Sequence, residues 1–265
     1  MPVHPLAFVI AMSALIVAPA ASAEPLKIIA LGDSLTAGFG VDPEAAFPAQ
    51  LERALQERGH DIVILNGGVS GDTASDGLAR VDWAIDDTAD AVIVELGAND
   101  ALRAVDPAIT RDALDKLLAR LTDERGLPVL LVGMMAPRNL DAEYTNAFDS
   151  IYPDLAERYD TLFYPFFLDG VATDATLNQD DGIHPRAEGY AVIVERMLPS
   201  VEALIEQVRK ENQAGALQLP EQQTILSMIR DGGSPCRACS PASKSPPRSA
   251  SDWPSSVAGS RAPAG

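Results

Sequence analysis

The chain has 265 residues, with 38 acidic and 20 basic side chains and a formal net charge of −18. Residues 212–265 hold five Lys and Arg against three Asp and Glu, and residues 1–23 hold no charged side chain, so residues 24–211 carry −20. A field of this sign repels phosphate backbones and anionic lipid surfaces. The composition therefore argues against a nucleic acid partner.

The first 23 residues are predicted to be a secretory signal peptide. An apolar run covers residues 6–17, and Ala21-Ser22-Ala23 forms a small-x-small cleavage signal, although no Lys or Arg precedes the run. A helix that spans a membrane needs roughly 20 apolar residues, which makes a retained anchor the less favoured alternative. We expect an exported protein, periplasmic or secreted, without a stable membrane anchor after cleavage.

Residues 24–211 are predicted to form one domain, and residues 212–265 a disordered low-complexity tail. The domain contains no cysteine, but 188 residues bury roughly 70% of the unfolded chain's surface, which is enough for one core. The tail is rich in Ser, Pro, Ala and Gly, a composition typical of disorder. Cys236 and Cys239 lie in it with the spacing of half a metal site or a redox pair. Without further ligands or a βαβ context, an incidental pair is favoured.

Apolar runs alternate with amphipathic patterns along residues 24–211. Short continuous apolar runs that end at Gly, Asn or Asp predict buried strands, and apolar residues three and four apart predict helices. The expected strands are 26–31, 61–65, 91–96, 129–132 and, more weakly, 161–164; the expected helices are 47–58, 73–85, 107–124, 144–159 and 187–210. Pro153 should kink or split the fourth helix, and Pro199 interrupts the last. This alternation predicts an α/β fold with a mostly parallel, doubly wound sheet.

Ser34 stands where the first predicted strand ends. The apolar run breaks into Gly32-Asp33-Ser34, which leaves the serine at the carboxyl end of the strand, where open α/β sheets bind ligands. Gly-Asp-Ser is also a common composition for turns and helix starts. Ser70 is the alternative, but residues 68–72 lack the G-x-S-x-G pattern of a nucleophile elbow. That segment is interpreted as a loop with outward backbone N–H groups, or simply as a Gly-rich turn.

Nucleophilic acyl transfer also needs a base, a group that orients the base, and oxyanion donors. After the signal segment, which holds His4, the histidines are His60 and His184. His60 enters the second strand at the wrong edge of the sheet, so His184 is the candidate base. Asp181, three residues earlier, can accept a hydrogen bond from the imidazole within a turn. Alone, this spacing equally fits a helix-capping aspartate beside a surface histidine.

Asn99 follows the third predicted strand, at the same edge as Ser34. Its side-chain amide can donate to an oxyanion, although a helix cap or an Asx turn is the more frequent use of such a residue. Five apolar residues are candidates for contact with an acyl group, or else for the core: Leu102, Met134, Met135, Phe166 and Phe167.

Four blocks, in order, resemble the SGNH, or GDSL, hydrolase family. The resemblance covers about residues 26–209, and the surrounding sequence is similar to the exported thioesterase, lysophospholipase and arylesterase branch. Ala98 replaces a glycine often seen in the third block, and the tail has no counterpart. The blocks are Gly32-Asp33-Ser34-Leu35, Ser70-Gly71-Asp72-Thr73, Gly97-Ala98-Asn99-Asp100 and Asp181-Gly182-Ile183-His184-Pro185.

The resemblance implies a flavodoxin-like three-layer α/β/α sandwich with a five-stranded parallel sheet. It implies a triad in which Ser34 is the nucleophile, His184 the base and Asp181 its partner. The oxyanion hole would consist of the Ser34 and Gly71 backbone N–H groups and the Asn99 side chain. We therefore expect a monomeric serine esterase that hydrolyses acyl, aryl, thio- or lysophospholipid esters through an acyl-enzyme, with no cofactor and no metal.

Three alternatives remain open from sequence. An exported acetyl-glycan esterase would use the same triad, and a non-catalytic lipid- or glycan-binding protein would use the same fold. A metal-dependent phosphoesterase has only one suitable histidine ligand. The metal ligands of such a phosphoesterase would be Asp33, Asn99, Asp180, Asp181 and His184. The acidic domain also makes anionic coenzyme A thioesters less natural substrates.

Overall fold

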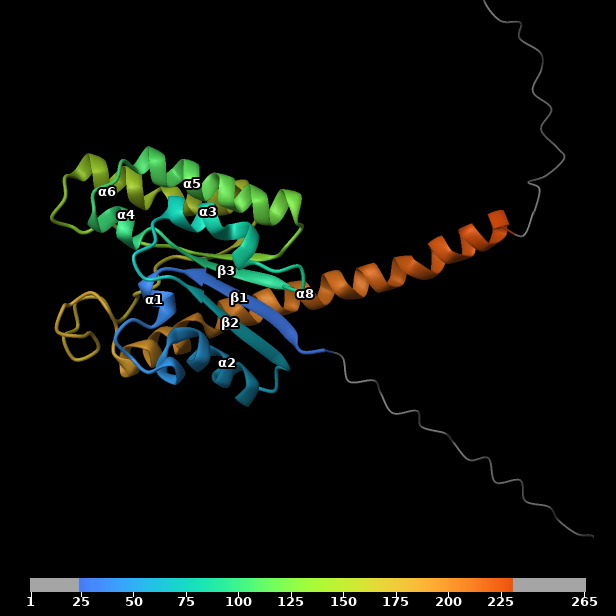
Figure 1. The fold of residues 1–265 in the computed structure, drawn as a ribbon, viewed down its shortest axis with the longest axis horizontal. Helices are drawn as coiled ribbons and strands as arrows, with labels where there is room; N and C mark the ends of the chain where they lie inside the picture. Colours follow the sequence, from blue (N-terminus) through green and yellow to red (C-terminus); the bar gives the residue numbers. More distant parts are fainter. Residues whose placement is uncertain (1–23, 231–265) are drawn as a thin grey trace, which may run out of the picture. The chain divides into compact units, whose positions relative to one another are not determined.

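The computed structural model describes residues 24–230, with side chains as far as residue 214. The predicted signal peptide and the two cysteines lie outside the described residues. Five parallel strands form one sheet in the order β2-β1-β3-β4-β5 (Figure 1). The strands are β1 (Leu26–Gly32), β2 (Ile62–Gly68), β3 (Ala91–Glu95), β4 (Val129–Val132) and β5 (Leu162–Tyr164).

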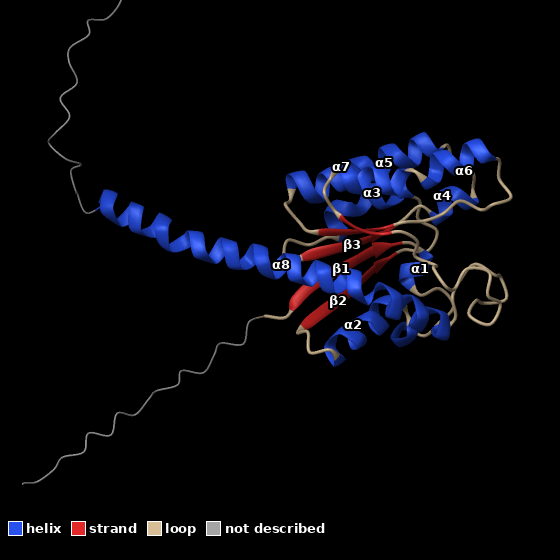
Figure 2. Ribbon diagram, turned by 180° about the vertical axis from the view of Figure 1, so that it is seen from behind, coloured by secondary structure: helices blue, strands red, loops and turns tan. Residues whose placement is uncertain are grey.

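Helices cover both faces of the sheet, which confirms the predicted three-layer architecture (Figures 1 and 2). One face carries α3 (Ala74–Ala84), α4 (Ala98–Leu102), α5 (Pro107–Ala119), α6 (Ala142–Asp149) and α7 (Ile151–Arg158). The other carries α1 (Ser34–Ala37), α2 (Phe47–Glu57) and the first part of α8 (Ala187–Arg230). A short η1 (Pro43–Ala45) precedes α2, and a π-helical turn, η2 (Arg120–Glu124), extends α5.

The central strands have the composition that two covered faces require. Every residue of β3 and β4 is buried, as expected for a continuous apolar run between two helical layers. The register places Gly32 opposite Gly68 on one side and Glu95 on the other. A Cβ at Gly32 would lie 2.7 Å from the carbonyl oxygen of Glu95, so the close approach of β1 and β3 at this point requires glycine. Three strand ends are thereby level at the carboxyl edge.

The helix predicted over 144–159 is split, as expected, whereas the helix predicted over 187–210 is not interrupted. The helical pattern over 144–159 is split, but at Ser150, and Pro153 falls in the first turn of α7, where the missing N–H would have no intrahelical partner anyway. The predicted interruption at Pro199 is wrong, because α8 continues through it. Pro199 faces solvent while Leu198 and Val201 are buried. Burial of such side chains offsets the roughly 3 kcal/mol that a proline costs inside a helix.

The boundary predicted at residue 211 does not coincide with the end of α8. The chain separates after Gly215 into two units, and α8 continues as helix to Arg230, within the segment predicted to be disordered. Residues 212–230 are rich in Gln and Leu, which favour helix, whereas the Ser- and Pro-rich composition starts later. Residues 231–265 lie outside the described part. Among the described helices, none has the length and apolarity needed to cross a membrane.

Candidate active site

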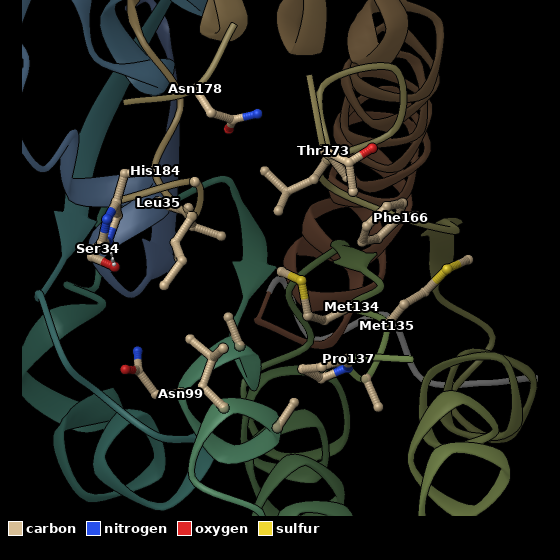
Figure 3. Close-up of a pocket in the computed structure, with 18 of the residues that line it drawn as sticks. Ser34, Leu35, Asn99, Met134, Met135, Pro137, Phe166, Thr173, Asn178 and His184 are labelled. Atoms are coloured by element: carbon tan, nitrogen blue, oxygen red, sulfur yellow. Dashed lines mark hydrogen bonds between the residues drawn. The ribbon is translucent and has the colours of Figure 1, made fainter. Parts of the chain in front are cut away.

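Ser34 lies at the carboxyl edge of the sheet as the first residue of α1. Asp33 caps this one-turn helix, since its carboxylate accepts a hydrogen bond from the Leu35 N–H at 2.9 Å, and Gly38 ends the turn with a φ of +80°. The Ser34 Oγ lies 2.9 Å from Nε2 of His184 (Figure 3). The end of β1 and the short helix together direct the serine hydroxyl toward this histidine.

His184 comes from the loop between β5 and α8. Asn178 and Pro185 form an isolated antiparallel bridge, and the Gln179 N–H donates to the His184 carbonyl at 2.8 Å. Gly182 turns the loop at a φ of +71°, a conformation that favours glycine. The loop is therefore closed on itself, although most of its side chains are exposed.

Asp181 forms both the turn and the contact with the imidazole. Its Oδ1 accepts from the N–H groups of Ile183 and His184, and its Oδ2 lies 2.7 Å from Nδ1 of His184. The His184 side chain first, and then these backbone N–H groups, lower the pKa of Asp181 to about 2. An ionised carboxylate only accepts, so Nδ1 carries the proton and Nε2 is left to accept from Ser34. The helix-cap interpretation does not hold, because α8 begins only at Ala187.

Two backbone amides and one side chain are the sequence-predicted oxyanion donors. Among the described residues, neither the Ser34 nor the Gly71 N–H has an acceptor. Gly71 has a φ of +94°, and its carbonyl accepts from Arg103 Nη2 at 3.0 Å. Asn99 Nδ2 donates to the Asp72 carbonyl at 3.0 Å and to Asp33 Oδ2 at 3.2 Å. An oxyanion would therefore share the Asn99 amide with Asp33 or displace the longer of these bonds.

Two buried carboxyl groups lie beneath the serine, and sequence reasoning assigned neither a role in the triad. Glu95, the last residue of β3, is 1% exposed, and its Oε2 accepts from Thr36 Oγ1 at 2.7 Å. Burial, and next the charge of Asp33, raises the pKa of Glu95 well above its usual range and so favours the protonated form of this carboxyl. Burial also raises the pKa of Asp33 to about 6, against the hydrogen bonds from Leu35 and Asn99.

A cavity of about 440 Å³ opens beside Ser34 and His184. Leu35 and His184 lie on one side of it, and Met134, Met135 and Phe166 lie on the other (Figure 3). Leu102 also lines the cavity, so four of the five apolar candidates from the sequence are lining residues. The fifth, Phe167, is core instead: it is fully buried, and its ring meets that of Phe47 edge-on at 5.1 Å.

The remaining sequence candidates lie elsewhere. Nε2 of His60 is 3.5 Å from Glu202 before the start of β2, at the amino edge of the sheet. Ser70 is exposed in the turn before Gly71, while His184 contacts Ser34. Asp180, one of the five residues of the metal hypothesis, forms an ion pair with Arg186 at 2.7 Å. Over residues 24–230, no group of three or more His, Cys, Asp or Glu side chains has a metal-binding arrangement.

Comparison with known proteins identifies the family of the chain. Residues 30–192 match the GDSL-like Lipase/Acylhydrolase family. An arylesterase of Vibrio mimicus is 40% identical over 177 residues, 66% of this chain and 88% of that protein. Esterase TesA of Pseudomonas aeruginosa is 34% identical over 186 residues, 70% of this chain and 91% of that protein. The crystal structure of AlinE4, a SGNH-hydrolase family esterase, is 44% identical with a TM-score of 0.58, covering 69% of this chain and 98% of that one. The chain therefore belongs to the GDSL-like lipase/acylhydrolase family and is a serine esterase of the SGNH type.

Proposed function

We propose that this esterase hydrolyses carboxylic esters through an acyl-enzyme on Ser34. The observation that carries the proposal is the chain of contacts from Asp181 to His184 to Ser34, with distances of 2.7 and 2.9 Å. Both distances are within the reach of proton transfer. The order of the three groups fits the roles of an orienting carboxylate, a base and a nucleophile.

The reaction follows from the positions of the hydrogen atoms. His184 Nε2 accepts the Ser34 proton as Oγ attacks the ester carbonyl, and Asp181 stabilises the imidazolium that forms. The oxyanion of the tetrahedral intermediate takes hydrogen bonds from the amides of Ser34 and Gly71 and from Asn99. His184 then gives the proton to the leaving alcohol. A water molecule, activated by the same histidine, releases the acid and restores the hydroxyl of Ser34.

The cavity supports an apolar acyl or aryl ester as substrate. Leu102, Met134 and Phe166 offer no charge to a substrate group beside Ser34. Pockets of roughly 300–1,000 Å³ with apolar walls and a few polar groups hold small molecules, and this cavity is in that range. These walls favour an apolar acyl group over the acetyl group of the glycan alternative. We further propose that the chain is exported, since its first 23 residues have the signal-peptide pattern.

Labelling with a fluorophosphonate, followed by peptide mapping, tests the nucleophile. We expect one adduct, on the peptide that contains Ser34, and hydrolysis of nitrophenyl esters that is lost in Ser34→Ala. An adduct on Ser70, or turnover that survives in Ser34→Ala, would contradict the assignment. Exhaustive chelation should leave wild-type turnover unchanged, whereas a metal-dependent phosphoesterase would lose it.

A series of nitrophenyl esters of increasing acyl length tests the substrate. We expect kcat/KM to rise from acetyl to longer acyl groups, because each buried methylene contributes about 0.8 kcal/mol. The matched variant Met134→Ser should flatten that rise without changing the acetyl ester. A preference for acetyl groups in the wild type would favour the glycan esterase instead.

A further inference from the structure

Arg80 is a buried cation that the proposed mechanism does not use. Its side chain projects from α3 and is 8% exposed. Nε donates to Asp72 Oδ2 at 2.6 Å, and Nη2 donates to the carbonyl of Gly32 at 2.8 Å. A buried guanidinium destabilises the fold unless it is paired and hydrogen-bonded. Both conditions are met here, and the rigid planar group joins two acceptors that are 40 residues apart in sequence.

The two acceptors belong to the backbone segments that carry the two proposed amide donors. Gly32 precedes Ser34 by two residues, and Asp72 directly follows Gly71. The Gly32 carbonyl also accepts from the Val69 N–H at 3.0 Å, while the Asp72 N–H donates to the Val69 carbonyl at 3.1 Å. The turn 69–72 is therefore attached to the end of β1 at two points. Val69 bonds directly to Gly32, and Asp72 is connected to Gly32 through Arg80.

The same turn contacts the third donor. Asn99 Nδ2 donates to the Asp72 carbonyl at 3.0 Å. Asp72 therefore contacts Arg80 through its side chain and Asn99 through its backbone. Asp100, which is fully buried, accepts from the Ala74 N–H at 2.9 Å and so attaches the start of α3 to α4. Arg80 lies at the centre of a network that connects all three segments of the proposed oxyanion hole.

We propose that Arg80, paired with Asp72, is a positioning residue that sets the separation of the Ser34 and Gly71 amides. This inference rests on the proposed function, because it concerns the oxyanion hole of that reaction. Arg80 touches no reacting atom and acts through the peptide groups at positions 32 and 72. Its contribution is made mainly in the transition state, because the two amides must converge on a charge that the ground-state carbonyl lacks.

Arg80→Lys is the informative substitution. Lysine keeps the positive charge, but its single ammonium cannot reproduce the planar group that reaches both acceptors. We expect kcat to fall about 10- to 100-fold with KM nearly unchanged, the pattern of a small displacement of transition-state donors. The affinity for a boronic acid that forms a tetrahedral adduct on the serine should fall by the same factor.

Arg125→Lys is a matched control. Arg125 is 20% exposed and donates to two backbone carbonyls, Ile85 at 2.7 Å and Asp86 at 2.8 Å, at the amino edge of the sheet. The Arg125→Lys variant therefore loses comparable hydrogen bonds far from Ser34. Its change in melting temperature measures the structural cost alone. Asp72→Asn is a second variant that removes the charge without changing shape, and it serves if Arg80→Lys does not fold.

The inference holds if Arg80→Lys or Asp72→Asn loses kcat and boronic acid affinity in parallel while Arg125→Lys keeps both. It is overturned if Arg80→Lys and Arg125→Lys change only the melting temperature, or if KM alone rises. Failure of the proposed function would be a separate result. Turnover that survives in Ser34→Ala would contradict the proposed reaction, whatever the Arg80 variants show.

Discussion

Two aspartates flank Ser34 in opposite environments. Asp181 lies on a loop with its side chain 38% exposed, and its pKa is lowered to about 2 by His184 and two backbone N–H groups. Asp33 is fully buried, and burial raises its pKa to about 6. Solvent and hydrogen-bond donors favour the charged form, and burial disfavours it. The same residue type thus serves on one side of the serine as a stable anion and on the other as a buried acceptor.

The difference divides the site into a reactive half and a positioning half. The reactive half comprises Asp181 and His184, which come from one closed loop and which move the proton in the proposed mechanism. The positioning half comprises Asp33, Glu95 and Arg80, which lie beneath the serine and hold helix ends and turns. Substitutions in the first should remove the chemistry, whereas substitutions in the second should weaken its geometry or change the pH dependence of stability.

His184→Ala should have the largest effect. Without a base the Ser34 proton has no acceptor, and kcat should fall by about 10⁶-fold, as when other serine hydrolases lose this group. Steady-state hydrolysis of a nitrophenyl ester measures the loss. His60→Ala removes a histidine at the other edge of the sheet and should keep wild-type turnover; equal losses in the two variants would show that stability, and not proton transfer, is responsible.

Asp181→Asn should follow, with a fall in kcat of about 10⁴-fold, because an amide can hold the imidazole in the wrong tautomer. The matched control is Asp180→Asn, which removes the neighbouring exposed charge, whose partner is Arg186. Comparison of kcat between the two variants separates orientation from local charge. Similar values in both would contradict the role of Asp181.

Asn99→Ala should lower kcat by about 10²–10³-fold, the usual effect of losing one oxyanion donor. The substitution also removes the hydrogen bonds that Asn99 donates to Asp33 and to the Asp72 carbonyl. Because a tetrahedral boronic acid adduct needs the same oxyanion donors, its binding should weaken together with kcat. Asn66→Ala is the control, since that exposed asparagine lies on the edge strand β2 and its side chain donates to the backbone carbonyl of Ala37 in α1. A variant with wild-type kcat would exclude Asn99 from the oxyanion hole.

Asp33→Asn should have its clearest effect on stability. With a folded pKa of about 6 against an ordinary value of 3.8, folded Asp33 holds more protons than the unfolded chain between these values. The free energy of unfolding therefore falls as pH rises from about 4 to 6, and the substitution should make that fall smaller. Urea unfolding at a series of pH values measures this difference. An unchanged slope would contradict the raised pKa.

Sequence patterns predicted most of the fold because buried parallel strands have a distinctive composition. The runs at 91–96 and 129–132 became β3 and β4 with every strand residue buried. Pattern alone could not show that α8 continues through Pro199, since the packing of Leu198 and Val201 decides this. Apolar residues also look alike whether they form a cavity wall or the core, which is why Phe166 and Phe167 could not be separated.

The site was predictable where chemistry demands unusual residue types, and not where it demands support. Ser34, Asp181 and His184 were selected by elimination among few possible bases and by the resemblance to the SGNH family, and the structure brings the three side chains into contact. Arg80 gave no signal, because an arginine in a helical pattern is typical of a solvated face. Glu95 offered one clue, a single acid inside an apolar run, but its pKa depends first on burial and then on Asp33 and Thr36, and only the fold creates this environment.

The division into two halves is tested most directly by the rate at which a fluorophosphonate labels Ser34 in three proteins: wild type, Asp181→Asn and Glu95→Gln. Labelling measures the reactivity of the nucleophile without turnover. We expect Asp181→Asn to slow labelling by orders of magnitude. Glu95→Gln, which replaces a buried carboxyl of raised pKa with an isosteric neutral amide, should stay close to wild type. Equal slowing in both variants, or fast labelling in Asp181→Asn, would contradict the account.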